Sequence, residues 1–440
     1  MSASMQQDTV IAGTAPPPTY AEALKVWARI GLLSFGGPAG QIALMHRELV
    51  DERKWIDEGR YLNALNFCML LPGPEAMQLA TYVGWRLHGI KGGLTAGLLF
   101  VIPGALVVLG LSILYAAFGK LPLVEAVFIG IKAAVLAIVV EALLRIARRS
   151  LKGNVEWTIA GAAFVAIFFL AVPFPLIVLA AALIGFARGG VPAASSLARA
   201  DIEVPIAQTL ATTFTWLAIW IVPLAALAAI FGPSHVLSQI ALFFSKLAVV
   251  TFGGAYAVLA YMAQDVVQSY GWLTAGEMLD GLGLAETTPG PLILVTEFVG
   301  FLAAHRHGGG NPWVMGVLGA VVALWATFAP CFLWIFAGAP YIERLNAEPR
   351  LKAALAAVTA AVVGVILNLT VWFALHVLFA SVTERFAGPL RLHVPDLASI
   401  SLPALLLSGV AVLLLFVLHR GVLTTLAVCA ALALAWHAMG

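Results

Sequence analysis

Charged residues are scarce in this sequence. Lysine and arginine number 24 and aspartate and glutamate 22 in 440 residues, a charged share of 10%, whereas soluble globular proteins carry about 25%. So little charge excludes an ordinary soluble domain. The net charge of +2 is also not gathered into a basic patch, so we expect no nucleic-acid partner.

Cysteine and cofactor motifs are also sparse. Cys68, Cys331 and Cys429 lie far apart in apolar segments without a CxxC pair, which favours buried packing over a disulfide framework or a metal site. The sequence has no histidines four positions apart and no G-x-G-x-x-G, so it lacks the usual zinc and dinucleotide motifs. We therefore expect no metal, no cofactor and no enzymatic activity. The alternative, a membrane-embedded reductase, would need such motifs.

Long apolar runs are what the sequence has in place of charge. Hydrophobic residues make up 62% of the chain, and Leu94–Phe118 and Val314–Ala339 are two of the longest runs. Each is long enough to cross the ~30 Å hydrocarbon layer as a helix. A helix also satisfies its own backbone hydrogen bonds in lipid. The sequence therefore predicts an all-α, polytopic protein of the lipid bilayer.

The apolar segments define a domain organisation. Spans are predicted at 94–117, 123–146, 155–171, 174–187, 209–231, 312–338, 353–380, 401–418 and 421–438. We expect a disordered cytoplasmic tail at 1–20, a first transmembrane repeat at 21–200, a connecting helix at 201–235 and a second repeat at 236–440. The polar tail has no apolar core of a signal peptide.

An internal repeat relates the two halves at a constant spacing of 217 positions. Phe35-Gly36-Gly37 matches Phe252-Gly253-Gly254, Trp55 matches Trp272, and Pro72-Gly73-Pro74 matches Pro289-Gly290-Pro291. Chance does not place three such motifs at one spacing, so the chain is built from two related units.

Basic residues predict that the two units are inverted relative to each other. One odd connecting span would invert the second unit. Clusters at 53–54, 145–152 and 344–352 then all face the cytoplasm, as the positive-inside rule requires. Arg306, Arg385 and Arg391 are fewer and fall outside. The N-terminus is then cytoplasmic and the C-terminus periplasmic. Inverted repeats with broken half-helices are typical of secondary transporters.

Four helix breaks stand at repeat-related positions. They are Gly36-Gly37-Pro38, Pro72-Gly73-Pro74, Gly253-Gly254 and Pro289-Gly290-Pro291. A helix that restarts after a break presents free N–H groups and the positive end of its dipole, so four such ends would form an anion site. The alternative is that the breaks are kinks or tight helix crossings, which is our interpretation of the separate Gly93–Gly97 pair.

Charged and hydroxyl side chains flank the breaks. Arg29 and Lys246 each precede the phenylalanine of a break by six residues, and an intramembrane cation marks a functional site by default. We expect both to contact the anion, with snorkelling to the interface as the alternative for Arg29. Thr287 and Thr288 could add hydroxyl donors.

Four carboxylates are candidates for proton coupling or gating. Glu48 and Asp265 are repeat-related, Glu75 begins the half-helix after the second break, and Glu286 precedes the fourth break. The alternative for the Glu48 and Asp265 pair is a pair of interfacial carboxylates without a transport role.

Two segments resemble the signatures of a known family. FGGPAGQIALMHREL, Trp55 and LPGPEAMQLATYVGWRLHG resemble the first signature of the chromate transporter (CHR) family, and FGGAYAVLAYMAQDVV, Gly271-Trp272 and TTPGPLILVTEFVGF resemble the second. The resemblance spans the chain and is to the long, two-domain form. It places the family's FGG and PGP motifs on Phe35–Pro38, Phe252–Gly254, Pro72–Pro74 and Pro289–Pro291, and its basic residue on Lys246. Glu286 departs from the pattern, which has a neutral amide there.

The resemblance implies an exporter of chromate in the inner membrane of a bacterium or archaeon. The expected partners are chromate, sulfate as an alternative oxyanion, the lipid bilayer and, optionally, a second copy of the chain. A dianion that leaves a cell gains about 4.6 kcal/mol per 100 mV of inside-negative potential. A sulfate-type importer of the same fold and an anion channel are the alternatives.

Overall fold

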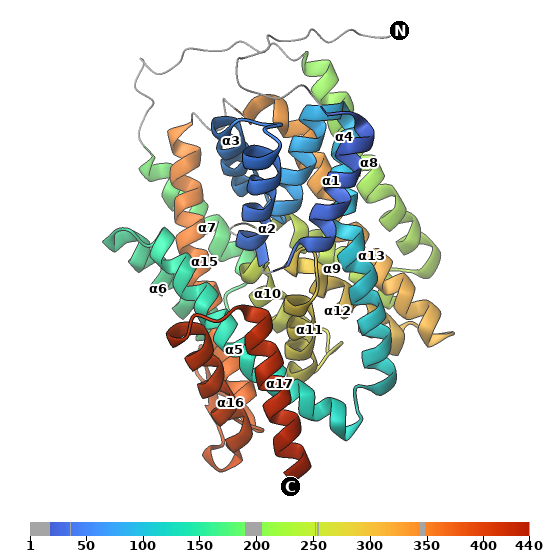
Figure 1. The fold of residues 1–440 in the computed structure, drawn as a ribbon. Helices are drawn as coiled ribbons and strands as arrows, with labels where there is room; N and C mark the ends of the chain where they lie inside the picture. Colours follow the sequence, from blue (N-terminus) through green and yellow to red (C-terminus); the bar gives the residue numbers. More distant parts are fainter. Residues whose placement is uncertain are drawn as a thin grey trace.

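The computed structural model describes residues 18–35, 37–189, 205–250, 252, 255–342 and 348–439. Three predicted site glycines, Gly36, Gly253 and Gly254, lie outside these residues, as do most of the predicted tail and the start of the connecting segment. The described chain is almost entirely helical (Figure 1). Six helices are long and apolar enough to span a membrane: α4 (Glu75–Phe118), α5 (Pro122–Ser150), α8 (Ile206–Phe231), α13 with η4 (Pro312–Tyr341), α15 (Pro349–Leu378) and α17 (Val422–Met439). The all-α, polytopic prediction is confirmed.

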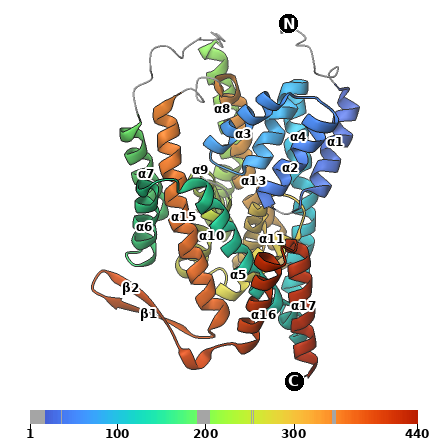
Figure 2. The ribbon, with the colours of Figure 1, turned by 60° about the vertical axis from the view of Figure 1, so that its left-hand side comes forward.

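The first half opens with broken helices. They are α1 (Tyr20–Leu33), α2 (Gly37–His46), a π-helical turn η1 (Arg47–Glu52) and α3 (Glu58–Leu70), which precedes α4. The second half has α9 (Val236–Val250), α10 (Ala255–Gln264), a π-helical turn η2 (Asp265–Ser269), α11 (Ala275–Thr287), η3 (Leu292–Leu294) and α12 (Val295–His307). Both views place α1, α2 and α3 nearer the N-terminal end of the molecule than α11 (Figures 1 and 2).

The sequence repeat is also a repeat of local structure. The bounds of α3 and α11 differ by 217 positions at both ends (58 and 275, 70 and 287), and each follows a π-helical turn. The N–H of Trp55 donates to the carbonyl of Leu49 at 2.8 Å, and that of Trp272 to Val266 at 3.0 Å. Equivalent hydrogen bonds therefore stand at equivalent positions of the two segments, and the division of the chain into two repeat units stays a prediction.

Lys54 occupies a position for which glycine is better suited. Its φ is +54°, and its counterpart in the second unit is Gly271, with φ +62°. A left-handed conformation costs a residue with a Cβ roughly 1–2 kcal/mol, and replacing it by glycine removes this cost. The greater freedom of glycine in the unfolded chain offsets part of the stability that is gained. We expect Lys54→Gly to raise the free energy of unfolding by up to ~1 kcal/mol, measured by thermal unfolding in detergent. Lys25→Gly, inside α1, should lower it by about the same amount. A destabilised Lys54→Gly protein would contradict this account.

The long helix α4 is two helices joined at a sharp reversal. His88 and Gly89 leave the helical conformation, and Gly89 has φ +62°. The two arms then lie so close that a Cβ on Gly84 would sit 2.4 Å from the carbonyl oxygen of Gly92. The predicted half-helix after the second break and the predicted span at 94–117 are therefore the two arms of α4.

Close glycine contacts recur in the second half and elsewhere along α4. A Cβ on Gly300 would lie 2.6 Å from the carbonyl oxygen of Gly319 in α13. A Cβ on Gly93 or Gly97 would meet the ring of Phe336 or Phe332, respectively. The packing interpretation of the Gly93–Gly97 pair is therefore confirmed.

The remaining elements include two short helix pairs. α6 (Asn154–Phe168) and α7 (Phe174–Arg188) have 15 residues each, and α16 (Leu402–Val412) continues into η6 (Leu413–Val417). These coincide with predicted spans but are shorter than the ~20 residues that cross a bilayer.

A β-hairpin is the one feature absent from the sequence predictions. β1 (Val382–Ala387) and β2 (Leu390–Pro395) pair antiparallel around a turn with Gly388 at φ +61°, and η5 (Leu397–Ser399) follows. The hairpin projects towards the end of the molecule where α17 ends, away from α1 (Figure 2). Its short alternating pattern is easily overlooked beside long apolar runs.

Candidate functional site

The first break begins with a tight turn at Ser34. Ser34 has φ −77° and ψ +67°, and the N–H of Phe35 donates to the carbonyl of Leu33 at 2.9 Å, which is an inverse γ-turn. In the second unit the N–H of Phe252 donates to the carbonyl of Val250 at 3.0 Å. The two phenylalanines of the predicted site therefore end equivalent helices in the same way.

The first and fourth breaks meet. Gly290, at φ +92°, donates its N–H to the carbonyl of Ser34 at 2.8 Å, and its own carbonyl accepts from the Gln41 amide at 2.6 Å. A broken backbone in lipid must be satisfied by protein or water, and here each break supplies partners to the other. The buried amide of Gln41 is thereby used to join the breaks.

The second break is closed by its own half-helix. Gly73 has φ +115°, and the amide of Gln78 donates to the carbonyl of Pro72 at 2.7 Å. A Cβ on Gly73 would lie 2.8 Å from the Gln78 amide nitrogen and 3.0 Å from the Cys331 sulfur. This position therefore requires glycine for both conformation and space.

The restarting helices keep uncapped N-termini. Pro74 is the N-cap of α4 and Pro291 that of η3, and neither offers a side chain that caps the helix. The first-turn N–H groups of α4 are therefore open to an anion. The half-buried Glu75 side chain stands at the same helix end.

A cavity of about 700 Å³, which we call the vestibule, reaches the breaks. Its lining includes Pro38, Gly73, Glu75 and Tyr256, and its walls come mainly from α2, α3 and α5. The remaining lining residues are Ala39, Ile42, Ala43, His46, Tyr61, Leu62, Leu65, Cys68, Met69, Leu71, Ala142, Arg145, Ile146, Arg149, Ser150, Lys152, Glu156, Ala356 and Thr359. The vestibule therefore brings two of the four predicted breaks, Gly73 and Pro38, to one hollow.

Three basic residues line the vestibule at the C-terminal end of α5. Arg145 is paired with Glu141, one turn earlier, whereas Arg149 and Lys152 make no ion pair with any described residue. The lining also holds two acidic side chains, Glu75 and Glu156, against these three basic ones. A concave surface with an excess of positive charge attracts counter-ions, so the basic end of the vestibule favours an anion. From the sequence alone this cluster was predicted only to mark the cytoplasmic side. The spacing of its residues, which puts them on one helix face, is the signal that could have predicted a basic cavity wall.

Glu286 does not line the vestibule but is hydrogen-bonded to a residue that does. The Tyr256 hydroxyl, which lines the cavity, donates to the Glu286 carboxylate at 2.7 Å, and Glu286 is buried. The hydroxyls of Thr287 and Thr288 donate to the carbonyls of Leu284 (2.8 Å) and Ala285 (3.2 Å). To act as the predicted oxyanion donors, these two hydroxyls would first have to break their hydrogen bonds to the carbonyls of their own helix.

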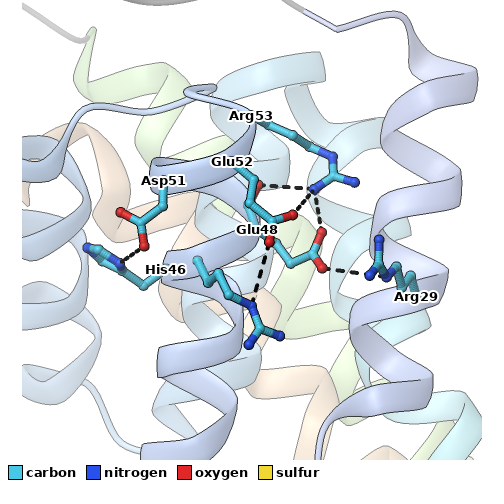
Figure 3. A network of polar contacts seen from close by, with 7 residues as sticks. Arg29, His46, Glu48, Asp51, Glu52 and Arg53 are labelled. Carbon is cyan, nitrogen blue, oxygen red and sulfur yellow. Dashed lines mark hydrogen bonds and ion pairs between the residues drawn. The ribbon is translucent and has the colours of Figure 1, made fainter.

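Arg29 and Glu48 belong to one ion-pair network (Figure 3), and neither of them lines the vestibule. Arg29 Nε lies 3.5 Å from a Glu48 carboxylate oxygen, and Arg53 pairs with the other oxygen. Glu48 is fully buried, whereas the Arg29 side chain is 55% exposed. Both residues were predicted to act on the anion or on protons. In this arrangement they neutralise each other and join α1 to η1.

Lys246 and Asp265, their repeat counterparts, make no ion pair with any described residue, and Asp265 is hydrogen-bonded to Tyr261. Lys246 is exposed, and its Nζ lies 5.5 Å from the centre of the Tyr261 ring. Asp265 begins η2 and is half-buried. Neither lines the vestibule.

Removing the charge of Glu48 should destabilise the first unit. Loss of one partner of a buried pair costs roughly 3–5 kcal/mol, and the partly exposed arginines reduce that figure. We expect Glu48→Gln to lower the free energy of unfolding by about 2 kcal/mol, measured by thermal unfolding. Arg47→Gln removes an exposed pair with Glu52 in the same turn and should cost under ~1 kcal/mol. Equal effects of the two substitutions would contradict this account.

The comparisons with known proteins agree with the motif pattern. The sequence model of the family described as "Chromate transporter" matches residues 21–186 and 238–436. The "Chromate transport protein" of Cupriavidus metallidurans is 32% identical over 382 residues, 83% of this chain and 86% of that protein. That of Pseudomonas aeruginosa is 34% identical over 374 residues, 82% and 83% of the two chains.

A third relative extends the comparison. The "Probable chromate transport protein" of Synechococcus elongatus is 32% identical over 339 residues, 77% of this chain and 80% of that protein. No solved structure matches the chain. Within the described residues no cluster of His, Cys, Asp or Glu side chains is arranged to hold a metal ion.

Proposed function

The chain belongs to the chromate transporter family, and from this premise we propose that it exports chromate, a tetrahedral dianion, across the inner membrane. The family is one of transporters rather than enzymes. The observation that carries the proposal is the vestibule, which joins a basic cluster to the uncapped helix end after Gly73.

The anion enters past the basic cluster and is bound at the break. Arg149 and Lys152 make no ion pair with any described residue, so they are available to attract a dianion, although Arg149 also interacts electrostatically with Glu75. At the deep end, the first-turn N–H groups of α4 supply donors and the helix dipole supplies partial positive charge. Gly73 lines the vestibule beside this helix end, and a side chain there would collide with Gln78 and Cys331.

Glu75 is our candidate for proton coupling. It lines the vestibule beside the helix end where the anion would sit, so a negative carboxylate there opposes binding. A protonated Glu75 would admit the dianion, and binding and protonation would then favour each other. Glu48 is less suited, since it already has two arginine partners. Glu286 and Asp265 lie outside the vestibule lining.

Export fits an inverted-repeat architecture with a cytoplasmic N-terminus. If the two units are inverted, the vestibule of the first faces the cytoplasm, where its basic cluster obeys the positive-inside rule. A dianion leaving through it gains about 4.6 kcal/mol per 100 mV. Direct contact of the anion with Arg29 and Lys246 stays a prediction, because both lie outside the vestibule.

Counterflow in proteoliposomes tests the proposal. Vesicles loaded with unlabelled chromate or sulfate should accumulate labelled chromate, and an imposed pH gradient should change the rate if Glu75 carries a proton. Preferential exchange of sulfate would favour the alternative substrate, and flux without exchange would favour a channel. Vesicles of known orientation separate export from import. Absence of exchange of either anion would refute the proposal.

A further inference from the structure

A second, much smaller polar pocket lies beside the β-hairpin. Its volume is about 10 Å³, enough for about one water molecule. It is lined by Gln264, Gln268, Asn368, Leu369, Trp372, Arg391 and His393. These residues come from α10, η2, the C-terminal part of α15 and β2, near the end of the molecule opposite the N-terminus (Figure 2).

One wall of this pocket corresponds to a wall of the vestibule in the first unit. α5 and α15 both begin with proline, at 122 and 349, so they correspond at a spacing of 227. Ala142 and Arg145 of the vestibule then correspond to Leu369 and Trp372 of the small pocket.

The same helix face is open in the first unit and closed in the second. Leu62 on α3 lines the vestibule and is 45% exposed, whereas its counterpart Leu279 on α11 is fully buried. Gly283 allows α11 to approach α5, since a Cβ there would lie 2.2 Å from a methyl carbon of Ile131. Asp280 on α11 is held by Lys132 of α5 at 3.4 Å and by the Tyr115 hydroxyl at 2.8 Å.

Arg391 fills the small pocket without a carboxylate partner among the described residues. The side chain is buried, and its terminal nitrogens donate to Gln268 Oε1 at 3.1 Å and to the carbonyl of Ile167 at 3.3 Å. Its backbone N–H donates to the carbonyl of Phe169 at 2.7 Å. A buried guanidinium held only by neutral oxygens keeps its full charge uncompensated.

Two further donors around Arg391 have no acceptor. Arg391 Nε and Trp372 Nε1 are buried and make no hydrogen bond with any described residue. Of the His393 ring nitrogens, Nδ1 is buried without a partner among these residues, and Nε2 lies 3.2 Å from a Glu384 carboxylate oxygen. Unpartnered buried donors are costly, and here they converge on one hollow next to a positive charge, which is the chemistry of an anion site.

We propose that this pocket is the closed form of a second vestibule, which opens at the hairpin end when the first vestibule closes, and that Arg391 is its oxyanion contact. The inference rests on the proposed transport function. In the closed form Arg391 joins the hairpin to η2 and to the turn between α6 and α7. In the open form the Arg391 guanidinium leaves these neutral partners and binds the departing dianion. Its role there is like that of Arg149 and Lys152, which attract the entering dianion.

Cysteine accessibility tests the opening. In a background without Cys68, Cys331 and Cys429, Leu62→Cys should react with a membrane-impermeant maleimide from one side of the membrane and Leu279→Cys only from the other. Adding Arg391→Gln should speed the reaction of Leu279→Cys at least about tenfold, because the closed form loses its main tie. Leu302→Cys, buried in α12, should stay unreactive, which separates opening from unfolding. A Leu279→Cys that is unreactive from both sides, or reactive from the same side as Leu62→Cys, would overturn the second vestibule.

Substitutions of Arg391 test the anion contact. Arg391→Gln should reduce chromate counterflow at least about tenfold while Arg391→Lys retains part of it, and Arg385→Gln on the exposed part of the hairpin should leave it unchanged. If Arg391→Gln speeds the labelling of Leu279→Cys but the Gln and Lys variants have equal chromate counterflow, Arg391 only holds the closed form together. That result would overturn its role as an anion contact. The labelling experiment does not depend on a transported substrate. If the cysteines label as expected but neither chromate nor sulfate is exchanged in proteoliposomes, the transport proposal is refuted while the second vestibule is still supported.

Discussion

Replacing Gly104 by alanine should destabilise the protein more than any other single-methyl change discussed here. Gly104 lies in α4 against the fourth break, where a Cβ would sit 2.2 Å from the carbonyl oxygen of Pro289 and 2.7 Å from a methyl carbon of Leu294. The carbonyl belongs to a backbone whose neighbour, Gly290, is bonded to Ser34 and Gln41, so it cannot retreat without breaking those bonds. We expect a loss of about 3 kcal/mol in the free energy of unfolding and loss of transport.

Gly110→Ala is the matched control in the same helix. A Cβ at Gly110 meets nothing within 4 Å, and alanine is the better helix former by roughly 1 kcal/mol. Thermal unfolding in detergent and chromate counterflow should therefore be unchanged or slightly improved. If Gly104→Ala is as stable and active as Gly110→Ala, the close approach of α4 to the fourth break is not part of the fold.

Neutralising Arg149 should have the largest effect on the entry of the anion. Its guanidinium lines the vestibule, and its nearest described side-chain partner is the Met69 sulfur at 3.7 Å, so its charge is available to an anion. Basic surfaces of this kind raise association rates by roughly 10- to 1,000-fold. We expect Arg149→Gln to lower the initial rate of chromate counterflow at low chromate about tenfold, with a smaller loss at high salt because salt screens the field.

Lys246→Gln is the informative comparison for Arg149→Gln. The sequence predicts that Lys246 meets the anion, while the structure places its side chain over the Tyr261 ring and outside the vestibule. If Lys246→Gln abolishes counterflow and Arg149→Gln does not, the anion is bound by the cation before the third break, and the vestibule is not its route. The Arg149→Lys variant should retain most of the rate, since a flexible cation suffices for steering.

Much of the helical architecture could be predicted because hydrophobicity and helix breaks are local properties. The predicted spans at 123–146, 209–231 and 312–338 lie within α5, α8 and α13, which begin and end within a few residues of them. The repeat could be predicted because identical residues at one spacing produce identical turns, as the hydrogen bonds of Trp55 and Trp272 show. The hairpin at 382–395 was missed, since its stability depends on contacts such as that of Arg391 with Phe169, more than 200 residues away.

The candidate site could be predicted only in part. The breaks at Gly73 and Gly290 were found because glycine and proline mark special backbone conformations wherever they occur. The sequence did not predict which side chains the charged residues contact. Glu48 pairs with Arg29 and Arg53, and Tyr256 binds Glu286, although no local spacing shows which side chain an acid will meet. Arg306 counted against the predicted topology, and in the structure it pairs with Glu277.

The amino-acid sequence by itself determined the membrane class, the two related units and the positions at which the backbone must leave the helix, because scarce charge, apolar length and glycine or proline act over a few residues. Only the tertiary structure decided which charges are free. Arg29 is neutralised while Arg149 stands open, and Leu62 faces a cavity while its counterpart Leu279 is buried. Equivalent residues of the two similar segments differ in this way because exposure and ion pairing depend on how distant helices pack. One chain can therefore have an open cavity in one segment and a closed one in the other.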